Sequence, residues 1–389
     1  MLAVWGLLLM ALVLSRAGGN AGDWGFFTEG YGLLVHGHLT VPHRFVSARI
    51  GGGGLHLYAA HPALQIGPLA LLLVRLVTLL NDVNRYLTPS VLVLTGVATI
   101  RGVERIALRL SPMRQGEIHQ TVFIAGIFVM FAWVQALVQW RHTDDMLVMI
   151  GTTVALAAIV CRKPWVLGTA VGLSVAAKPT ALVLLPLLFA LSRRENLKAL
   201  AVAGMLIGGC WLPFVVVDPA TLHAGAAQIP VRPGSGLTAL GYSAGTTPPG
   251  AIRAVQLGVA LVGGAVAVLR RRWYLVPLIG FGLRTALDPS VASYYGVSVV
   301  LAALIADAVP TPHTPIKTLL AWVAFSEPFG LLTSYWPALP DSIQAWIRLG
   351  VPFGLTIFLL AVGVRSQSNA LADRDGSPPG LAHAGDPRS

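Results

Sequence analysis

Residues 146–192 read MLVMIGTTVALAAIVCRKPWVLGTAVGLSVAAKPTALVLLPLLFALS, and this stretch decides the fold class. It contains only three charged side chains, those of Arg162, Lys163 and Lys178. About 25% of the residues in a soluble protein are charged, and no soluble core could hide apolar runs that follow one another this closely. The stretch therefore predicts consecutive helices embedded in a lipid bilayer.

The composition of the whole chain extends this conclusion. Of its 389 residues, 55% are hydrophobic and 11% are charged, and the mean hydropathy is +0.72. These values exclude a soluble globular fold and predict an all-α, polytopic transmembrane bundle of about 11–13 membrane-embedded helices. We expect one such domain over residues 1–365, with a long first extracytoplasmic loop at 18–63. Residues 366–389 are polar and predict a disordered cytoplasmic tail.

Three of the apolar runs are unusual. The run at 64–81 fits the charge pattern only as a re-entrant or interfacial helix. The runs at 165–177 and 180–192 are too short to cross a ~30 Å hydrocarbon core, so we interpret them as half-helices that meet at Lys178–Pro179. The alternative is one long helix over 165–191. The other expected runs are 2–17, 88–108, 121–140, 146–161, 199–217, 251–269, 273–287, 291–308, 318–334 and 343–364.

The net charge is +11, yet its distribution does not favour nucleic-acid binding. Basic residues gather in short clusters between apolar runs, which is how positive charge orients a membrane protein. The clusters are Arg101/Arg105/Arg109/Arg114, Arg162/Lys163, Arg193/Arg194/Lys198, Arg270/Arg271/Arg272 and Arg365. If all of them face the cytoplasm, the opposite side carries the turn at Lys178 and the loops at 18–63, 141–145, 218–250, 288–295 and 335–341.

Candidate acidic residues lie in these outward loops. Asp23 follows the first apolar run among aromatic residues, with Glu29 further along, and a carboxylate there suits a general base acting on a sugar hydroxyl. The alternative for Asp23 is a helix cap or a headgroup-level loop residue. His142, Asp144 and Asp145 form a second acidic turn, RHTDD. It predicts a second catalytic carboxylate, a sugar-binding site, a divalent cation site or an ordinary helix start.

Candidate basic residues could bind a phosphate group. Lys178 lies within an apolar context, where a charge is costly and is by default a functional candidate, although a lysine at an interfacial turn can also snorkel to water. Arg284 could bind phosphate or pair internally with Asp288. Further candidates are Arg232, Tyr294 and Tyr295.

Four blocks of the sequence resemble the GT-C superfamily of membrane glycosyltransferases, and most of all its actinobacterial, polyprenyl-phosphate-mannose-dependent mannosyltransferases. They are GDWGFF with GYGLLVHGHL, then HPALQIGPLALLL, then HTDDMLVMIGTTVALAAIVCRKPWVLGTAVGLSVAAKPTALVLLPLL, and an arginine-containing segment that ends in Tyr294–Tyr295. The first three cover roughly residues 1–195. One departure is that Trp24 and Gly25 follow the first aspartate, where many members of the family have a second charged residue.

The resemblance implies a cleft open to lipid on the extracytoplasmic face of the plasma membrane. It implies a polyprenyl-phosphate sugar as donor, with mannose the first candidate, and a glycolipid or polysaccharide hydroxyl as acceptor. In such enzymes the first outer aspartate is the base, a role that falls on Asp23, and the second acidic turn corresponds to Asp144 and Asp145. No cofactor is expected, and membrane lipid is the only other partner implied.

Two other classes of function remain open at this point. A multi-pass transporter or lipid-linked-sugar flippase would also use broken helices and embedded charges, although it should show duplicated halves, which the sequence does not. A non-catalytic assembly factor would keep the bundle without depending on Asp23 or Lys178. The discriminating feature is whether the candidate residues converge on one outward site.

Overall fold

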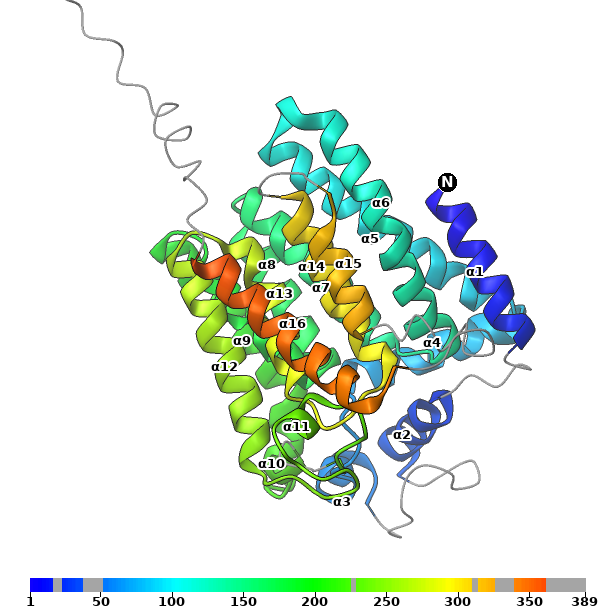
Figure 1. Cartoon of the computed structure of the whole chain (residues 1–389). Helices are drawn as coiled ribbons and strands as arrows, with labels where there is room; N and C mark the ends of the chain where they lie inside the picture. The colour runs from blue at the N-terminus through cyan, green and yellow to red at the C-terminus, as the bar shows by residue number, and fades with distance from the viewer. Residues whose placement is uncertain (17–22, 38–51, 225–228, 310–313, 326–338, 362–389) are drawn as a thin grey trace, which may run out of the picture.

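The computed structural model describes residues 1–16, 23–37, 52–224, 229–309, 314–325 and 339–361 (Figure 1). Over these residues the secondary structure is helical and contains no strand, so the predicted all-α class is confirmed for this part of the chain. The tail at 366–389 and part of the first loop, 38–51, lie outside the described residues.

Sixteen α-helices and six 3-10 or π-helical segments are found among the described residues. The α-helices are α1 (Leu2–Arg16), α2 (Trp24–His36), α3 (Leu57–Ala60), α4 (Pro68–Val83), α5 (Leu87–Leu110), α6 (Gln115–Val134), α7 (Thr143–Val160), α8 (Pro164–Ala177), α9 (Arg193–Val217), α10 (Thr221–Ala224), α11 (Gly236–Ala239), α12 (Ala251–Leu269), α13 (Val276–Ala286), α14 (Gly296–Ala308), α15 (Ile316–Phe325) and α16 (Asp341–Ala361). The short 3-10 or π segments are η1 (Gly54–His56), η2 (Pro112–Arg114), η3 (Gln135–Gln139), η4 (Pro179–Phe189), η5 (Trp273–Leu275) and η6 (Ser293–Tyr295).

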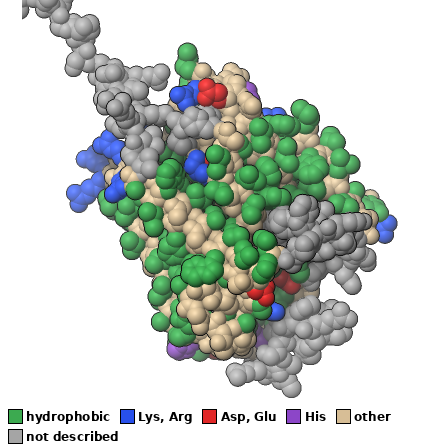
Figure 2. All heavy atoms as spheres, viewed as in Figure 1, with side chains coloured by type: hydrophobic (Ala, Val, Ile, Leu, Met, Phe, Trp, Pro, Cys, Tyr) green, Lys and Arg blue, Asp and Glu red, His purple; other side chains and the backbone are tan. Residues whose placement is uncertain are grey.

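Five segments of the described chain are long and apolar enough to cross a membrane, and five shorter helices are also apolar. The five long ones are Pro112–Gln139, Thr143–Val160, Arg193–Val217, Ala251–Leu269 and Asp341–Ala361. On the outer helices large apolar side chains are exposed, for example Met205 and Val262. Figure 2 shows apolar side chains over much of the visible face. These features support a multi-pass membrane protein, while the expected 11–13 embedded helices stay a prediction.

The centre of the bundle forms around α6. Its Trp133 is fully buried and donates a hydrogen bond from Nε1 to the Leu92 carbonyl of α5 at 2.7 Å. Gly96 permits this contact, because a Cβ at that position would lie 2.8 Å from the indole ring. Close packing of a large aromatic residue against a glycine thus fixes the α5–α6 pair.

Helices α5 and α7 run parallel, and this sets the orientation of the bundle. Thr95 Oγ1 contacts Met146 Sδ near the start of α7, and Arg109 donates to Cys161 Sγ just beyond its end. The start of α7 and the first turns of α5 therefore lie at the same end of the molecule. The positive-inside rule predicts that the end with Arg109 faces the cytoplasm.

Helix α4 begins and ends at the same end of the bundle. Its preceding residue, Gly67, donates from its backbone N–H to the Ala177 carbonyl at 2.8 Å. Further along α4, six residues before its end, the Val77 carbonyl accepts from Thr88 Oγ1 at the start of α5. In Figure 1, α4 lies across the ends of its neighbours rather than alongside them. A helix that makes no net crossing of the membrane must begin and end on the same side of it, as α4 does.

The chain breaks at Lys178–Pro179, where the sequence predicts two half-helices rather than one long helix. Helix α8 has 14 residues and ends at Ala177, Lys178 is extended with φ −150° and ψ 116°, and the 11 residues of η4 follow. Proline restricts the preceding residue to extended conformations and lacks an N–H donor. The second half is a 3-10 helix instead of the expected α-helix, and it contains a further proline, Pro186.

Candidate functional site

The candidate site lies where four separate segments meet at the start of α7. Asp23 directly precedes α2, His142 directly precedes α7, Lys178 occupies the break after α8, and Tyr294 belongs to η6. These segments come from distant parts of the chain, so the fold alone brings the side chains together.

The turn that carries His142 has an unusual backbone. Helix α6 continues into the π-helical segment η3, and Arg141 then adopts φ 56°, in the left-handed region. For a residue with a side chain this conformation costs roughly 1–2 kcal/mol. The reversal lets α7 start at Thr143 with Asp144 and Asp145 in its first turn, where acidic side chains interact favourably with the helix dipole. Strained turns and π-helical segments of this kind concentrate at functional sites.

His142 bridges two aspartates. Its Nε2 lies 3.2 Å from Asp23 Oδ2, and its Nδ1 lies 3.2 Å from Asp144 Oδ1. Ionised carboxylates only accept hydrogen bonds, so both ring nitrogens must donate, and the ring is an imidazolium. Burial opposes this charge, but the neighbouring Asp144 and Asp23 outweigh it and raise the pKa of His142.

Lys178 closes the acidic turn from the other side. Its Nζ lies 3.0 Å from Asp144 Oδ2 and 2.6 Å from Asp145 Oδ2, and all three side chains are buried. Together with His142 and Asp23 they form a chain of alternating charge. Four members are buried, whereas the Asp23 side chain is 34% exposed and forms the open end of the chain. Asp23 is therefore the member best placed to meet a ligand.

Aromatic rings enclose the charges. Tyr294 stacks on His142 with ring centroids 3.5 Å apart, and Phe27 of α2 contacts the same imidazole edge-on at 5.4 Å. Tyr295 lies 5.4 Å from Lys178 Nζ.

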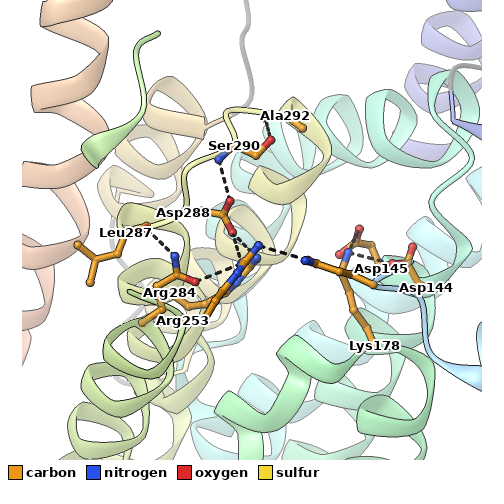
Figure 3. A network of polar contacts seen from close by, with 11 residues as sticks. Asp144, Asp145, Lys178, Arg253, Arg284, Leu287, Asp288, Ser290 and Ala292 are labelled. Atoms are coloured by element: carbon orange, nitrogen blue, oxygen red, sulfur yellow. Dashed lines mark hydrogen bonds and ion pairs between the residues drawn. The ribbon is translucent and has the colours of Figure 1, made fainter. Parts of the chain in front are cut away.

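A second ionic group lies on the far side of Tyr295. Asp288, fully buried, pairs with Arg284 and also with Arg253 Nη1 at 3.3 Å. Arg284 lies over the Tyr295 ring at 4.9 Å, which places this ring in contact with both Arg284 and Lys178. Figure 3 shows Lys178 with its two carboxylates on one side and the two arginines around Asp288 on the other.

The structure brings most, but not all, of the predicted site residues together. It gathers Asp23, His142, Asp144, Asp145, Lys178, Tyr294 and Tyr295, with Arg284 joined through Tyr295. Glu29 is buried on α2, six positions after Asp23. The Arg232 side chain is exposed and forms none of the ion pairs found among the described residues, although its backbone N–H donates to Pro289.

Arg253 belongs to this site, and the sequence-based prediction missed it. The same is true of Gln256, whose amide donates to the Leu287 carbonyl. Arg253 lies in the first turn of the apolar run at 251–269. A charge inside an apolar run is a functional candidate by default, and that signal would have identified it.

A cation could bind only by competing with Lys178. His142, Asp144 and Asp145 offer ligand atoms within 4.8 Å of one another. The Lys178 ammonium already lies within hydrogen-bond distance of both carboxylates, so a divalent ion in that space would have to displace it. The donor set therefore favours an internal ion pair over a metal centre.

Comparison with protein-family models finds no match, and comparison with curated proteins finds none either.

Proposed function

We propose that this chain is an integral membrane glycosyltransferase of the plasma membrane. It transfers a sugar, with mannose as the first candidate, from a polyprenyl-phosphate donor to a hydroxyl acceptor on the extracytoplasmic face. One observation carries the proposal: a partly exposed carboxylate, Asp23, shares a buried polar site with Lys178 and Arg284 at the end of the bundle away from the basic clusters. The resemblance of the sequence to GT-C enzymes supplies the donor class.

Asp23 is the general base in this proposal. The acceptor oxygen attacks the anomeric carbon, its proton passes to the Asp23 carboxylate, and the bond from that carbon to the phosphate oxygen breaks with its electron pair. The phosphate leaves on the face opposite the attack, so the configuration inverts. His142 contacts Asp23 Oδ2 and holds the carboxylate in place, because its other nitrogen is fixed by Asp144.

The leaving group needs positive charge rather than an acid. A phosphate monoester has a second pKa of about 6 and departs as an anion near neutral pH. Two arginines share the single carboxylate of Asp288, which leaves one positive charge in excess. Lys178, by contrast, is shared between two carboxylates. We therefore assign the phosphate to Arg284 and Arg253, and we assign Lys178 to holding Asp144 and Asp145.

The direct test is sugar transfer by the purified protein. The full chain in lipid nanodiscs is mixed with synthetic polyprenyl-phosphate [14C]mannose and a membrane glycolipid fraction as acceptor. We expect radiolabel in the acceptor together with stoichiometric polyprenyl phosphate. Absence of both products with mannose, glucose and arabinose donors would contradict the proposal.

The broken helix at Lys178 keeps a flippase as the second candidate, because discontinuous helices also build transport sites. The two functions differ in covalent chemistry. A flippase moves a fluorescent polyprenyl-phosphate sugar across a proteoliposome membrane and leaves it intact, whereas a transferase cleaves it. Analysis of the donor by mass spectrometry after incubation separates the two.

A further inference from the structure

We infer that the end of a groove between α5 and α7 that lies away from Asp23 binds the phosphate headgroup of an anionic membrane phospholipid. This goes beyond the proposed transfer reaction and does not depend on it. The groove has a volume of about 710 Å³ and extends from Thr95 and Ile150 to Arg109 and Cys161 at the ends of the two helices. Its lining includes Arg105, Arg109, Ile106, Ile150 and Val154.

The register of α5 and α7 creates the groove. Gly102 meets Thr153 midway along the parallel pair, and a Cβ at Gly102 would lie 2.8 Å from the threonine methyl group. The helices are in contact at that level and again where Arg109 meets Cys161. Small side chains, including Ala98 and Ala157, line the space along these contacts and leave it open.

The end of the groove that carries Arg105 and Arg109 is separate from the candidate site. Helix α7 has 18 residues, and its first turn carries Asp144 and Asp145 while Val160 and Cys161 border the groove. At about 1.5 Å per residue, the two ends of α7 lie about 27 Å apart. The groove thus faces the leaflet at which the basic clusters gather, which is the cytoplasmic leaflet by the positive-inside rule.

The two arginines of the groove lack acidic partners among the described residues. Arg101, one turn earlier on α5, pairs with Glu104, which shows how an arginine on this helix is neutralised when a carboxylate is available. Arg105 is exposed and forms no ion pair within the described chain. Arg109 is also exposed, and it donates to the Cys161 Sγ rather than to a carboxylate. Two guanidinium groups one helical turn apart therefore present positive charge at the groove.

The side chains around the two arginines favour a lipid over a soluble anion as the ligand. Exposed apolar side chains of both helices, among them Val154 and Leu110, border the two arginines. A soluble phosphate compound would leave the apolar wall uncovered, whereas a phospholipid covers it with an acyl chain and places its phosphate against the guanidinium groups. Basic pockets between helices on the cytoplasmic side bind anionic headgroups by the same electrostatics.

Native mass spectrometry of the full chain tests this inference. The protein in detergent is mixed with equal amounts of phosphatidylglycerol and phosphatidylcholine of identical acyl chains. We expect phosphatidylglycerol adducts to predominate. Each of Arg105→Gln and Arg109→Gln should lower phosphatidylglycerol retention about 5-fold, and the double variant about 25-fold, because a basic residue near an anionic headgroup contributes roughly a factor of five.

Two further variants test whether lipid retention depends on this groove and its arginines. Arg194→Gln removes an exposed charge from another basic cluster, outside the groove, and should retain the lipid like the wild type. Ala157→Trp, by contrast, fills the groove without changing its charge and should abolish retention of phosphatidylglycerol. Equal retention of both lipids, or an equal loss in Arg194→Gln, overturns the inference. So does a two-copy mass in place of lipid adducts that disappears in Ala157→Trp, because the groove would then bind a second copy of the chain.

Discussion

Asp23 and His142 are separated by 119 positions in the sequence, yet His142 Nε2 lies 3.2 Å from Asp23 Oδ2. This contact ties the segment before α2 to the segment before α7. It converts two acidic turns that look independent in the sequence into one chain of charges.

The His142 contact should make stability depend on pH. Its two carboxylate partners raise the pKa of the folded imidazole, whereas the unfolded chain titrates near 6.5. The stabilisation is therefore present in full below about pH 6.5 and is lost as the pH rises through the higher folded pKa. We expect the difference in Tm between wild type and His142→Gln to be largest in acid and to shrink as the pH rises, measured by thermal unfolding in detergent from pH 6 to pH 10. A difference that is constant, or that grows with pH, contradicts the imidazolium assignment.

Lys178 should be a structural requirement of the acidic turn. Lys178→Met leaves Asp144 and Asp145 buried without their shared cation, and breaking a buried ion pair costs about 3–5 kcal/mol. Adding Asp145→Asn removes one of the unpaired charges and should restore part of the loss. Thermal unfolding checks both variants, with the exposed Lys198→Met as the matched control. The same Tm for the single and the double variant would show that the carboxylates do not depend on Lys178.

The arginines around Asp288 should govern donor binding. Arg253→Gln removes the excess positive charge but keeps Arg284 paired with Asp288. A hydrogen bond to a charged group contributes about 1.5–3 kcal/mol, so we expect KM for the polyprenyl-phosphate donor to rise about 10–100-fold with a smaller change in kcat. Steady-state kinetics in nanodiscs measure this, with Arg85→Gln at an exposed site as control. A fall in kcat at unchanged KM would place Arg253 elsewhere in the reaction.

The two acidic turns should lie on one face of the membrane. Helix α7 spans about 27 Å at about 1.5 Å per residue, close to the ~30 Å of the hydrocarbon core. Alkaline phosphatase fused after Asp23 or after His142 should therefore be active, and the same reporter fused after Lys163 should be inactive. Opposite activities of the first two fusions would place Asp23 and His142 on opposite faces of the membrane and would contradict the proposed site.

Local chemistry explains which features the sequence could predict. The break at Lys178–Pro179 was predictable because two apolar runs are too short to cross and a proline separates them. Asp23 and the RHTDD turn stand out because charges are rare next to long apolar runs. These signals need no knowledge of distant parts of the chain.

Pairings between distant segments could not be predicted in this way. Nothing in the sequence indicates that His142 bridges Asp23 and Asp144, or that Arg253 shares Asp288 with Arg284. The sequence left Arg284 open between a phosphate ligand and an internal partner of Asp288, and the structure shows the internal pair. The 3-10 character of η4 also depends on packing, which periodicity does not encode.

Sugar transfer by Asp23→Asn, compared with the wild type and with Asp82→Asn, shows whether Asp23 is the general base. Asparagine keeps the size of the side chain but cannot accept the hydroxyl proton, and loss of a general base lowers the rate about 10²–10⁴-fold. Asp82 is an exposed aspartate of α4, and its variant should transfer sugar at the wild-type rate. We predict that Asp23→Asn still folds and binds donor but transfers at least 100-fold more slowly. Transfer by Asp23→Asn at the wild-type rate would contradict the account.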